Sequence, residues 1–186
     1  MAQVLVILIF LFSFLNAEFK VKSLKEIKYK NVTAQSYEES CGASAISSLF
    51  NMYGLDTNET AMIKELNTTD MVNFLDLQKI AKSNNFKAKG YKITKEIFEQ
   101  LTIPVIARII RKRDYPHFVV ALNIKGDFVL LLDPNNGKFL VTKEEFYNSW
   151  IGQDSNYILV AIPNDKLSLK NIDFLDISKF DYIKDK

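Results

Sequence analysis

The sequence predicts an α+β fold, in which helices from the first half pack on a mostly antiparallel sheet formed by the second half. In the first half, apolar residues recur at helical spacing, as in the segment 45–53. In the second half, short apolar runs alternate with turn residues, as in 117–133. The chain has 186 residues, of which 48% are hydrophobic and 25% charged. This is the size and composition of one compact domain.

Three helices are expected before residue 84. The first has Cys41 in its first turn and stops at Gly54, which is expected as the C′ residue just beyond the helix end. The second covers 59–66. The third runs over 72–83, where apolar residues again follow helical spacing and two asparagines give a stop signal.

The second half is expected to form strands with two short helices between them. The predicted strands are 86–91, 103–110, 117–122, 128–133, 138–141 and 157–162, and the predicted helices are 95–100 and 143–150. The tripeptide 125–127, Lys-Gly-Asp, lies between two apolar runs and is typical of an antiparallel hairpin. Such a hairpin brings His117 and Asp133 to the same end of the sheet.

The two ends of the chain differ from the predicted domain over 18–162. No charged side chain occurs from Met1 to Ala17, and the apolar stretch 4–15 is shorter than the ~20 residues that span a bilayer. We therefore expect a signal peptide over 1–17, with an uncleaved membrane anchor as the first alternative and a buried N-terminal helix or strand as the second. The protein is then exported, periplasmic or extracellular, with membrane contact only through an uncut N-terminus. Residues 163–186 are read as a charged C-terminal tail.

Composition excludes several classes of partner. The chain has 24 basic and 22 acidic residues, a formal net charge of +2, and no long basic tract, so nucleic acid is not expected as a partner. One cysteine and one histidine give too few soft ligands for a structural zinc site and no intramolecular disulfide. We expect neither a metal nor an organic cofactor.

Four residues have the chemistry of a thiol-dependent acyl-transfer site. Cys41 lies in the first turn of a predicted helix, where free N–H groups and the helix dipole favour a thiolate and can hold an oxyanion. His117 is the only imidazole base available, and Asp133 can orient it. The side-chain amide of Gln35 can donate to the oxyanion. Each residue also fits an ordinary role, such as packing for the cysteine or turn initiation for the aspartate.

The order and spacing of these residues resemble peptidase family C39, papain-like cysteine peptidases that process bacteriocin leader peptides. The resemblance covers roughly residues 30–162 and rests on Gln35-x5-Cys41-Gly42-x-x-Ala45, His117-Phe118-Val119-Val120 and Asp133-Pro134-x-x-Gly137. It implies a papain-like fold with Cys41 as nucleophile, His117 as base, Asp133 as orienting residue and Gln35 as oxyanion donor. It also implies cleavage after a Gly-Gly-like pair through an acyl-enzyme.

The chain departs from the family pattern in two ways. Familiar members are the cytosolic N-terminal domain of an ABC exporter, whereas no Gly-x-x-x-x-Gly-Lys-[Ser/Thr] nucleotide loop occurs in these 186 residues. The expected partners are therefore a peptide or protein substrate with a small-residue cleavage site and a separate exporter. Ser40 and Ala43 stand where the family commonly has an aspartate before the cysteine and a proline two residues after it.

Two other functions stay open at this stage. A cell-wall amidase or endopeptidase, or an acyltransferase, can use cysteine, histidine and an acid in the same chain order. A non-catalytic C39-like module would instead bind a peptide without a reactive thiol. The spacing of Gln35 and the Asp133-Pro134 turn favour the peptidase. Retention of the complete set of four residues argues against the binding module.

Overall fold

A computed structural model describes residues 22–110, 116–124, 126–150 and 156–165. Its helices are α2 (Leu24–Lys28), α3 (Cys41–Met52), α4 (Glu59–Leu66), α5 (Phe74–Ser83), α6 (Lys95–Gln100) and α7 (Lys143–Trp150); its strands are β1 (Phe86–Lys92), β2 (Val105–Ile110), β3 (Pro116–Asn123), β4 (Phe128–Asp133), β5 (Gly137–Thr142) and β6 (Tyr157–Pro163). The predicted signal peptide and the tail beyond residue 165 lie outside the described residues.

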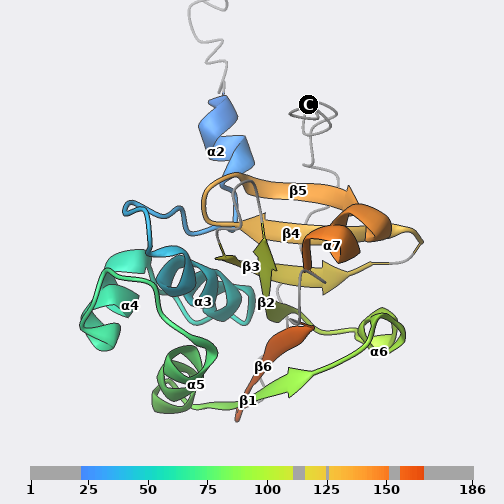
Figure 1. Cartoon of the computed structure of the whole chain (residues 1–186). Helices are drawn as coiled ribbons and strands as arrows, with labels where there is room; N and C mark the ends of the chain where they lie inside the picture. The colour runs from blue at the N-terminus through green and yellow to red at the C-terminus, as the bar shows by residue number, and fades with distance from the viewer. Residues whose placement is uncertain (1–21, 111–115, 125, 151–155, 166–186) are drawn as a thin grey trace, which may run out of the picture.

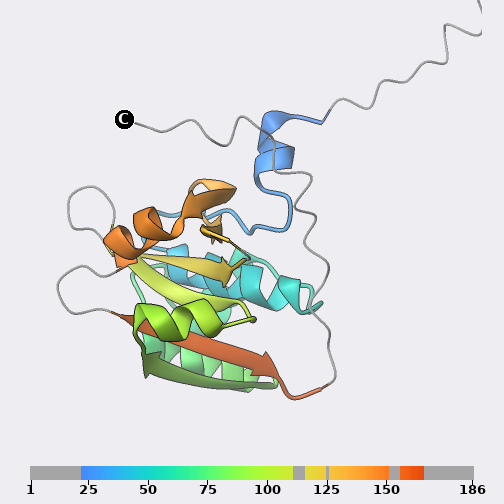
Figure 2. The same cartoon turned by 90° about the vertical axis from the view of Figure 1, so that its right-hand side faces the viewer.

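The six strands form one antiparallel sheet in the order β1-β6-β2-β3-β4-β5. Helices α3, α4 and α5 lie on one face of this sheet, and α6 and α7 lie on the other (Figure 1). Turned by 90°, the molecule shows α2 at the β5 end, opposite β1 and α5 (Figure 2). The α+β class predicted from the sequence is confirmed.

Two apolar cores hold the layers together. Because side chains alternate along a strand, Phe118 and Val120 of β3 join the core under α3, whereas Val119 and Ala121 join the core under α6 and α7. Helix α3 is buried along nearly its whole length. This burial fixes the first turn of α3, which begins with Cys41, against the sheet.

Most predicted boundaries agree with the structure, and two are wrong for local reasons. The third helix begins at Phe74 rather than at residue 72, because the Asn73 side chain accepts the N–H of Asp76 while the Asp76 carboxylate accepts the N–H of Asn73. Strand β2 begins at Val105 rather than at residue 103, since Pro104 before it has no N–H to donate to a neighbouring strand.

Helix α2 was not predicted from the basic segment before residue 31. It begins with a capping box, in which Ser23 and Glu26 satisfy each other's backbone N–H groups. Just after it, the Tyr29 hydroxyl donates to the Asn135 carbonyl at 2.6 Å. The segment thus packs on the turn between β4 and β5, next to Asp133.

Candidate active site

Cys41 is the first residue of α3 and is 2% exposed. The backbone N–H of Phe118 in β3 lies 3.5 Å from its Sγ atom, so the thiol sits where the helix meets the sheet. Gly42 allows this close packing: a Cβ atom there would lie 2.4 Å from Cγ2 of Val72. The glycine after the cysteine therefore has a steric reason, which the sequence alone did not reveal.

His117 and Asp133 are in contact, as the hairpin geometry predicted. The Nε2 atom of His117 lies 2.8 Å from Oδ1 of Asp133. The strand register explains how they meet. Val120 of β3 pairs with Leu132 of β4, so the next residue of β4, Asp133, lies opposite β3 near the start of that strand, where His117 is. The carboxylate is 0% exposed and the histidine side chain 13%. This ion pair is largely withdrawn from water.

The Asp133 carboxylate also builds its own turn. Its Oδ1 atom accepts the N–H groups of Asn135 at 2.8 Å and Asn136 at 3.2 Å, and Oδ2 accepts the Asn136 side-chain amide at 3.3 Å. The turn ends at Gly137, whose φ of 79° is left-handed and where a Cβ atom would lie 2.4 Å from the carbonyl oxygen of Lys28. The Asp133 carboxylate thus both starts this turn and contacts His117.

The surroundings of His117 favour its protonated form. Burial lowers the pKa of His117, but hydrogen bonds to Asp133 and Cys41 and the charges of both residues outweigh it, and the pKa rises from 6.5 to about 9. Because Nε2 is bound to Asp133, Nδ1 is the nitrogen left to exchange a proton with the thiol. A histidine protonated near neutral pH stabilises an adjacent thiolate.

Gln35 is tied to both sides of the site. Its backbone N–H donates to the Pro134 carbonyl at 2.9 Å, which links it to the Asp133 turn. Its side-chain Nε2 donates to the carbonyls of Tyr37 at 2.9 Å and Glu38 at 3.1 Å. The amide is therefore engaged within the turn before α3, and donation to an oxyanion stays a prediction.

One charged residue near Cys41 was not predicted from the sequence. Glu59, the first residue of α4, is 6% exposed and its Oε1 accepts the N–H of Ser36 at 2.7 Å and the hydroxyl of Ser40 at 2.5 Å. An acidic residue in the first turn of a helix is common, so the sequence held no signal for this contact.

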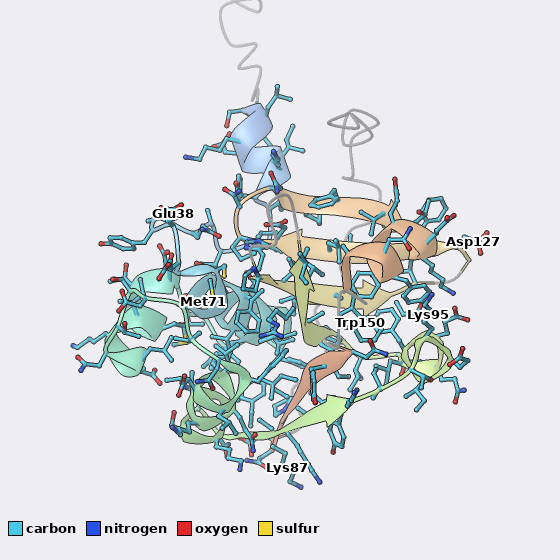
Figure 3. The ribbon with its side chains drawn as sticks, in the orientation of Figure 1. Glu38, Met71, Lys87, Lys95, Asp127 and Trp150 are labelled. Carbon is cyan, nitrogen blue, oxygen red and sulfur yellow. The ribbon has the colours of Figure 1, made fainter. Side chains whose placement is uncertain are left out.

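Figure 3 shows Glu38, in the segment before α3, on the side of the molecule that carries α4, whereas Asp127 and Trp150 lie on the other side.

Two further properties concern only the part of the chain that the structure describes. It contains no group of three or more His, Cys, Asp or Glu side chains arranged to hold a metal ion. Its helices are all too short or too polar to traverse a bilayer.

The chain is similar to known proteins over most of its length. The model of the peptidase C39 family matches residues 29–166. A probable functional amyloid protease, FapD of Pseudomonas fluorescens, is 31% identical over 142 residues, which are 72% of this chain and 62% of FapD. The lactococcin-G-processing and transport ATP-binding protein LagD of Lactococcus lactis is 30% identical over 127 residues, 66% of this chain and 18% of LagD. The chain thus spans less than two thirds of these relatives.

Two solved structures share the fold. A double glycine motif protease from an AMS/PCAT transporter, in complex with its leader peptide, is 26% identical with a TM-score of 0.60, over 71% of this chain and 90% of that one. The peptidase domain of Streptococcus ComA, a bi-functional ABC transporter, superimposes with a TM-score of 0.64 at 20% identity, over 71% of this chain and 97% of that one. The chain therefore belongs to peptidase family C39, a family of cysteine peptidases.

Proposed function

We propose that this protein is a cysteine peptidase that cleaves a peptide bond after a pair of small residues of the Gly-Gly type. The observation that carries the proposal is the contact of a buried Asp133 with His117 at 2.8 Å, beside a cysteine at the first turn of α3. Cys41, His117 and Asp133 lie on three different elements, α3, β3 and β4, and we assign them the roles of nucleophile, base and orienting acid that thiol catalysis requires.

The proposed reaction follows from the positions of these groups. In the proposed reactive ion pair the proton of the Cys41 thiol is already held on His117 Nδ1, and the Cys41 thiolate attacks the scissile carbonyl carbon to give a tetrahedral oxyanion. The backbone N–H of Cys41 and the amide of Gln35 are the donors proposed for that oxygen. The C–N bond then breaks, the leaving amine takes the proton from His117, and a thioester remains on Cys41. Water, deprotonated by His117, hydrolyses the thioester and regenerates the thiol.

Asp133 has a defined part in this cycle. By accepting the Nε2 proton of His117, it keeps Nδ1 directed at the thiol and stabilises the imidazolium that forms when Cys41 ionises. Its own position is held by the N–H groups of Asn135 and Asn136. The carboxylate therefore need not reorganise during the reaction.

The substrate class is proposed from the relatives together with the site. The 26% identical double glycine motif protease binds a leader peptide, which supports an extended peptide ending in small residues as substrate. FapD is named a probable functional amyloid protease, which supports an amyloid-forming protein as the source of such a segment. Export through residues 1–17 and work beside a separate exporter form part of this proposal and rest on the sequence.

The test is cleavage of synthetic peptides by the purified full chain. A panel carries Gly-Gly, Gly-Ala or Val-Val at one position in an otherwise constant sequence, and mass spectrometry locates the cut. We expect cleavage after the first two pairs, no cleavage after Val-Val, and no activity in Cys41→Ala. Cleavage of purified peptidoglycan with none of the peptides cut would instead indicate the cell-wall enzyme.

A non-catalytic peptide-binding role is the second candidate, favoured by one observation. The thiol is only 2% exposed, and a nucleophile must reach its substrate. The rate of alkylation of Cys41 by iodoacetamide near neutral pH separates the two roles. A catalytic site predicts rapid alkylation, whereas an inert thiol together with tight peptide binding indicates a binding module.

A further inference from the structure

Glu59 is a buried charged group that the proposed mechanism does not use. It is 6% exposed, lies at the first position of α4, and contacts Ser40, the residue immediately before the nucleophile. Taking a carboxylate out of water costs several kcal/mol unless hydrogen bonds replace its hydration. A buried carboxylate at this position therefore requires an explanation.

The carboxylate remains ionised because its partners compensate for burial. Desolvation raises the pKa of Glu59, but the hydrogen bonds from Ser40, Ser36 and Ser44 together lower it by more. The net shift of the pKa is therefore downward. The N-terminus of α4 adds a favourable dipole for a negative charge. At neutral pH, the Glu59 carboxylate thus accepts hydrogen bonds from Ser36 and Ser40 in the turn 35–40.

A chain of hydrogen bonds leads from this acceptor to the candidate oxyanion donor. The Ser40 hydroxyl has acceptors at 2.5 Å in Glu59 and at 2.9 Å in the Tyr37 carbonyl, and an ionised acceptor forms the stronger bond. When the Ser40 hydroxyl donates its hydrogen bond to Glu59, its oxygen is free to accept a hydrogen bond from the Tyr37 N–H, at 3.2 Å. The Tyr37 carbonyl in turn accepts from Gln35 Nε2 at 2.9 Å.

We infer that Glu59 is a positioning residue for the proposed peptidase. Its carboxylate holds Ser36 and Ser40, and through them it sets where the Gln35 amide and the first turn of α3 lie relative to a bound carbonyl. It acts only through these neighbours. The inference rests on the proposed function, and it assigns to α4 a part in catalysis.

The test compares Glu59→Gln with Glu65→Gln, a matched control. Glu65 is on the same helix and its carboxylate accepts from Asn84 at 2.8 Å in an exposed contact, away from the turn. The full chain of each variant is first shown to be folded by circular dichroism and cooperative urea unfolding, so that the rates refer to folded protein. We expect Glu59→Gln to lower kcat by about 10- to 100-fold, since a misplacement of ~1 Å can cost about 100-fold, with KM changed less than about threefold. Glu65→Gln should stay within about twofold of wild type.

A second variant covers the case in which Glu59→Gln fails to fold. Ser40→Ala removes one donor and keeps the carboxylate, and we expect a kcat decrease of about 3- to 10-fold from the loss of one link. The double variant should be no slower than Glu59→Gln alone, because both residues act in one network. A kcat within twofold of wild type in a folded Glu59→Gln protein, or in Ser40→Ala, would overturn the inference and leave Glu59 a stabilising residue only.

Failure of the proposed function itself is recognised separately. If wild type cleaves no peptide, the peptidase proposal fails, and the iodoacetamide rate of Cys41 between pH 5 and 9 then tests the positioning role alone. A changed pH profile in Glu59→Gln but not in Glu65→Gln supports positioning of the α3 turn. Identical profiles in all three proteins contradict it.

Discussion

The two sides of the candidate site are held in different ways. On the acid side, Asp133 is fixed by N–H groups two and three residues ahead in the chain. On the nucleophile side, the turn before Cys41 is fixed by Glu59, which is 23 residues from Ser36 and 19 from Ser40. The acid side is thus a local motif that carries its own geometry. The nucleophile side depends on the packing of α4 against α3.

The largest loss of activity is expected when Asp133, the residue that orients His117 toward the thiol, is changed. Asp133→Asn retains an oxygen for the local turn but removes the charge that orients and stabilises the imidazolium. We expect kcat/KM to fall by about 10³- to 10⁴-fold, the scale seen when a triad carboxylate becomes an amide. Asp127→Asn, in the exposed turn between β3 and β4, is the control and should leave kcat/KM unchanged. A loss below about tenfold in Asp133→Asn would show that the contact is structural.

The pH dependence sharpens the same comparison. The pKa of His117 in the folded protein is about 9, above its ordinary 6.5. Its stabilising contribution is therefore complete below about pH 6.5 and is lost as the pH rises to about 9. We expect both kcat/KM and the free energy of unfolding to decline on this alkaline side. In Asp133→Asn the decline should begin at lower pH; NMR titration of the single histidine measures the shift directly, and an unchanged midpoint would contradict the account.

A smaller effect, on stability, is expected where the end of α2 packs against the turn that follows Asp133. Gly137→Ala introduces a side chain at φ 79° and 2.4 Å from the Lys28 carbonyl, so strain and a clash combine to lower the free energy of unfolding by about 2–4 kcal/mol. Gly126→Ala is the matched control, because its φ is 88° but nothing lies within 4 Å of the added atom; it should cost only about 1 kcal/mol. Urea unfolding measures both. Equal costs would mean that α2 does not restrain the turn.

The smallest effect concerns one hydrogen bond to the acid-side turn. Tyr29→Phe removes the 2.6 Å bond to the Asn135 carbonyl and should lower the free energy of unfolding by about 0.5–1.5 kcal/mol. Tyr37→Phe, in an exposed side chain on the nucleophile side, should change stability by less than about 0.5 kcal/mol. Thermal unfolding of the two variants, side by side, checks the difference.

The same contrast explains what the sequence could predict. The helix that begins at Cys41 and the meeting of His117 with Asp133 follow from periodicity and from a hairpin with a short turn, which are local signals. Helix α2 also has a local signal, the capping-box residues Ser23 and Glu26. The contact of Glu59 with Ser40 had none, because it depends on how two helices pack. The engagement of the Gln35 amide by the Tyr37 carbonyl likewise depends on the path of the turn.

The central claim is that Cys41 forms a covalent acyl-enzyme with a peptide that ends in small residues. The most direct measurement is the intact mass of the protein, quenched with acid within the first turnover of a Gly-Gly peptide. The account predicts a mass increase equal to the N-terminal fragment minus water, located on Cys41, removed by hydroxylamine, absent in Cys41→Ala and slow to form in Asp133→Asn. Cleavage without this adduct, or an equal rate of cleavage by Cys41→Ala, would contradict it.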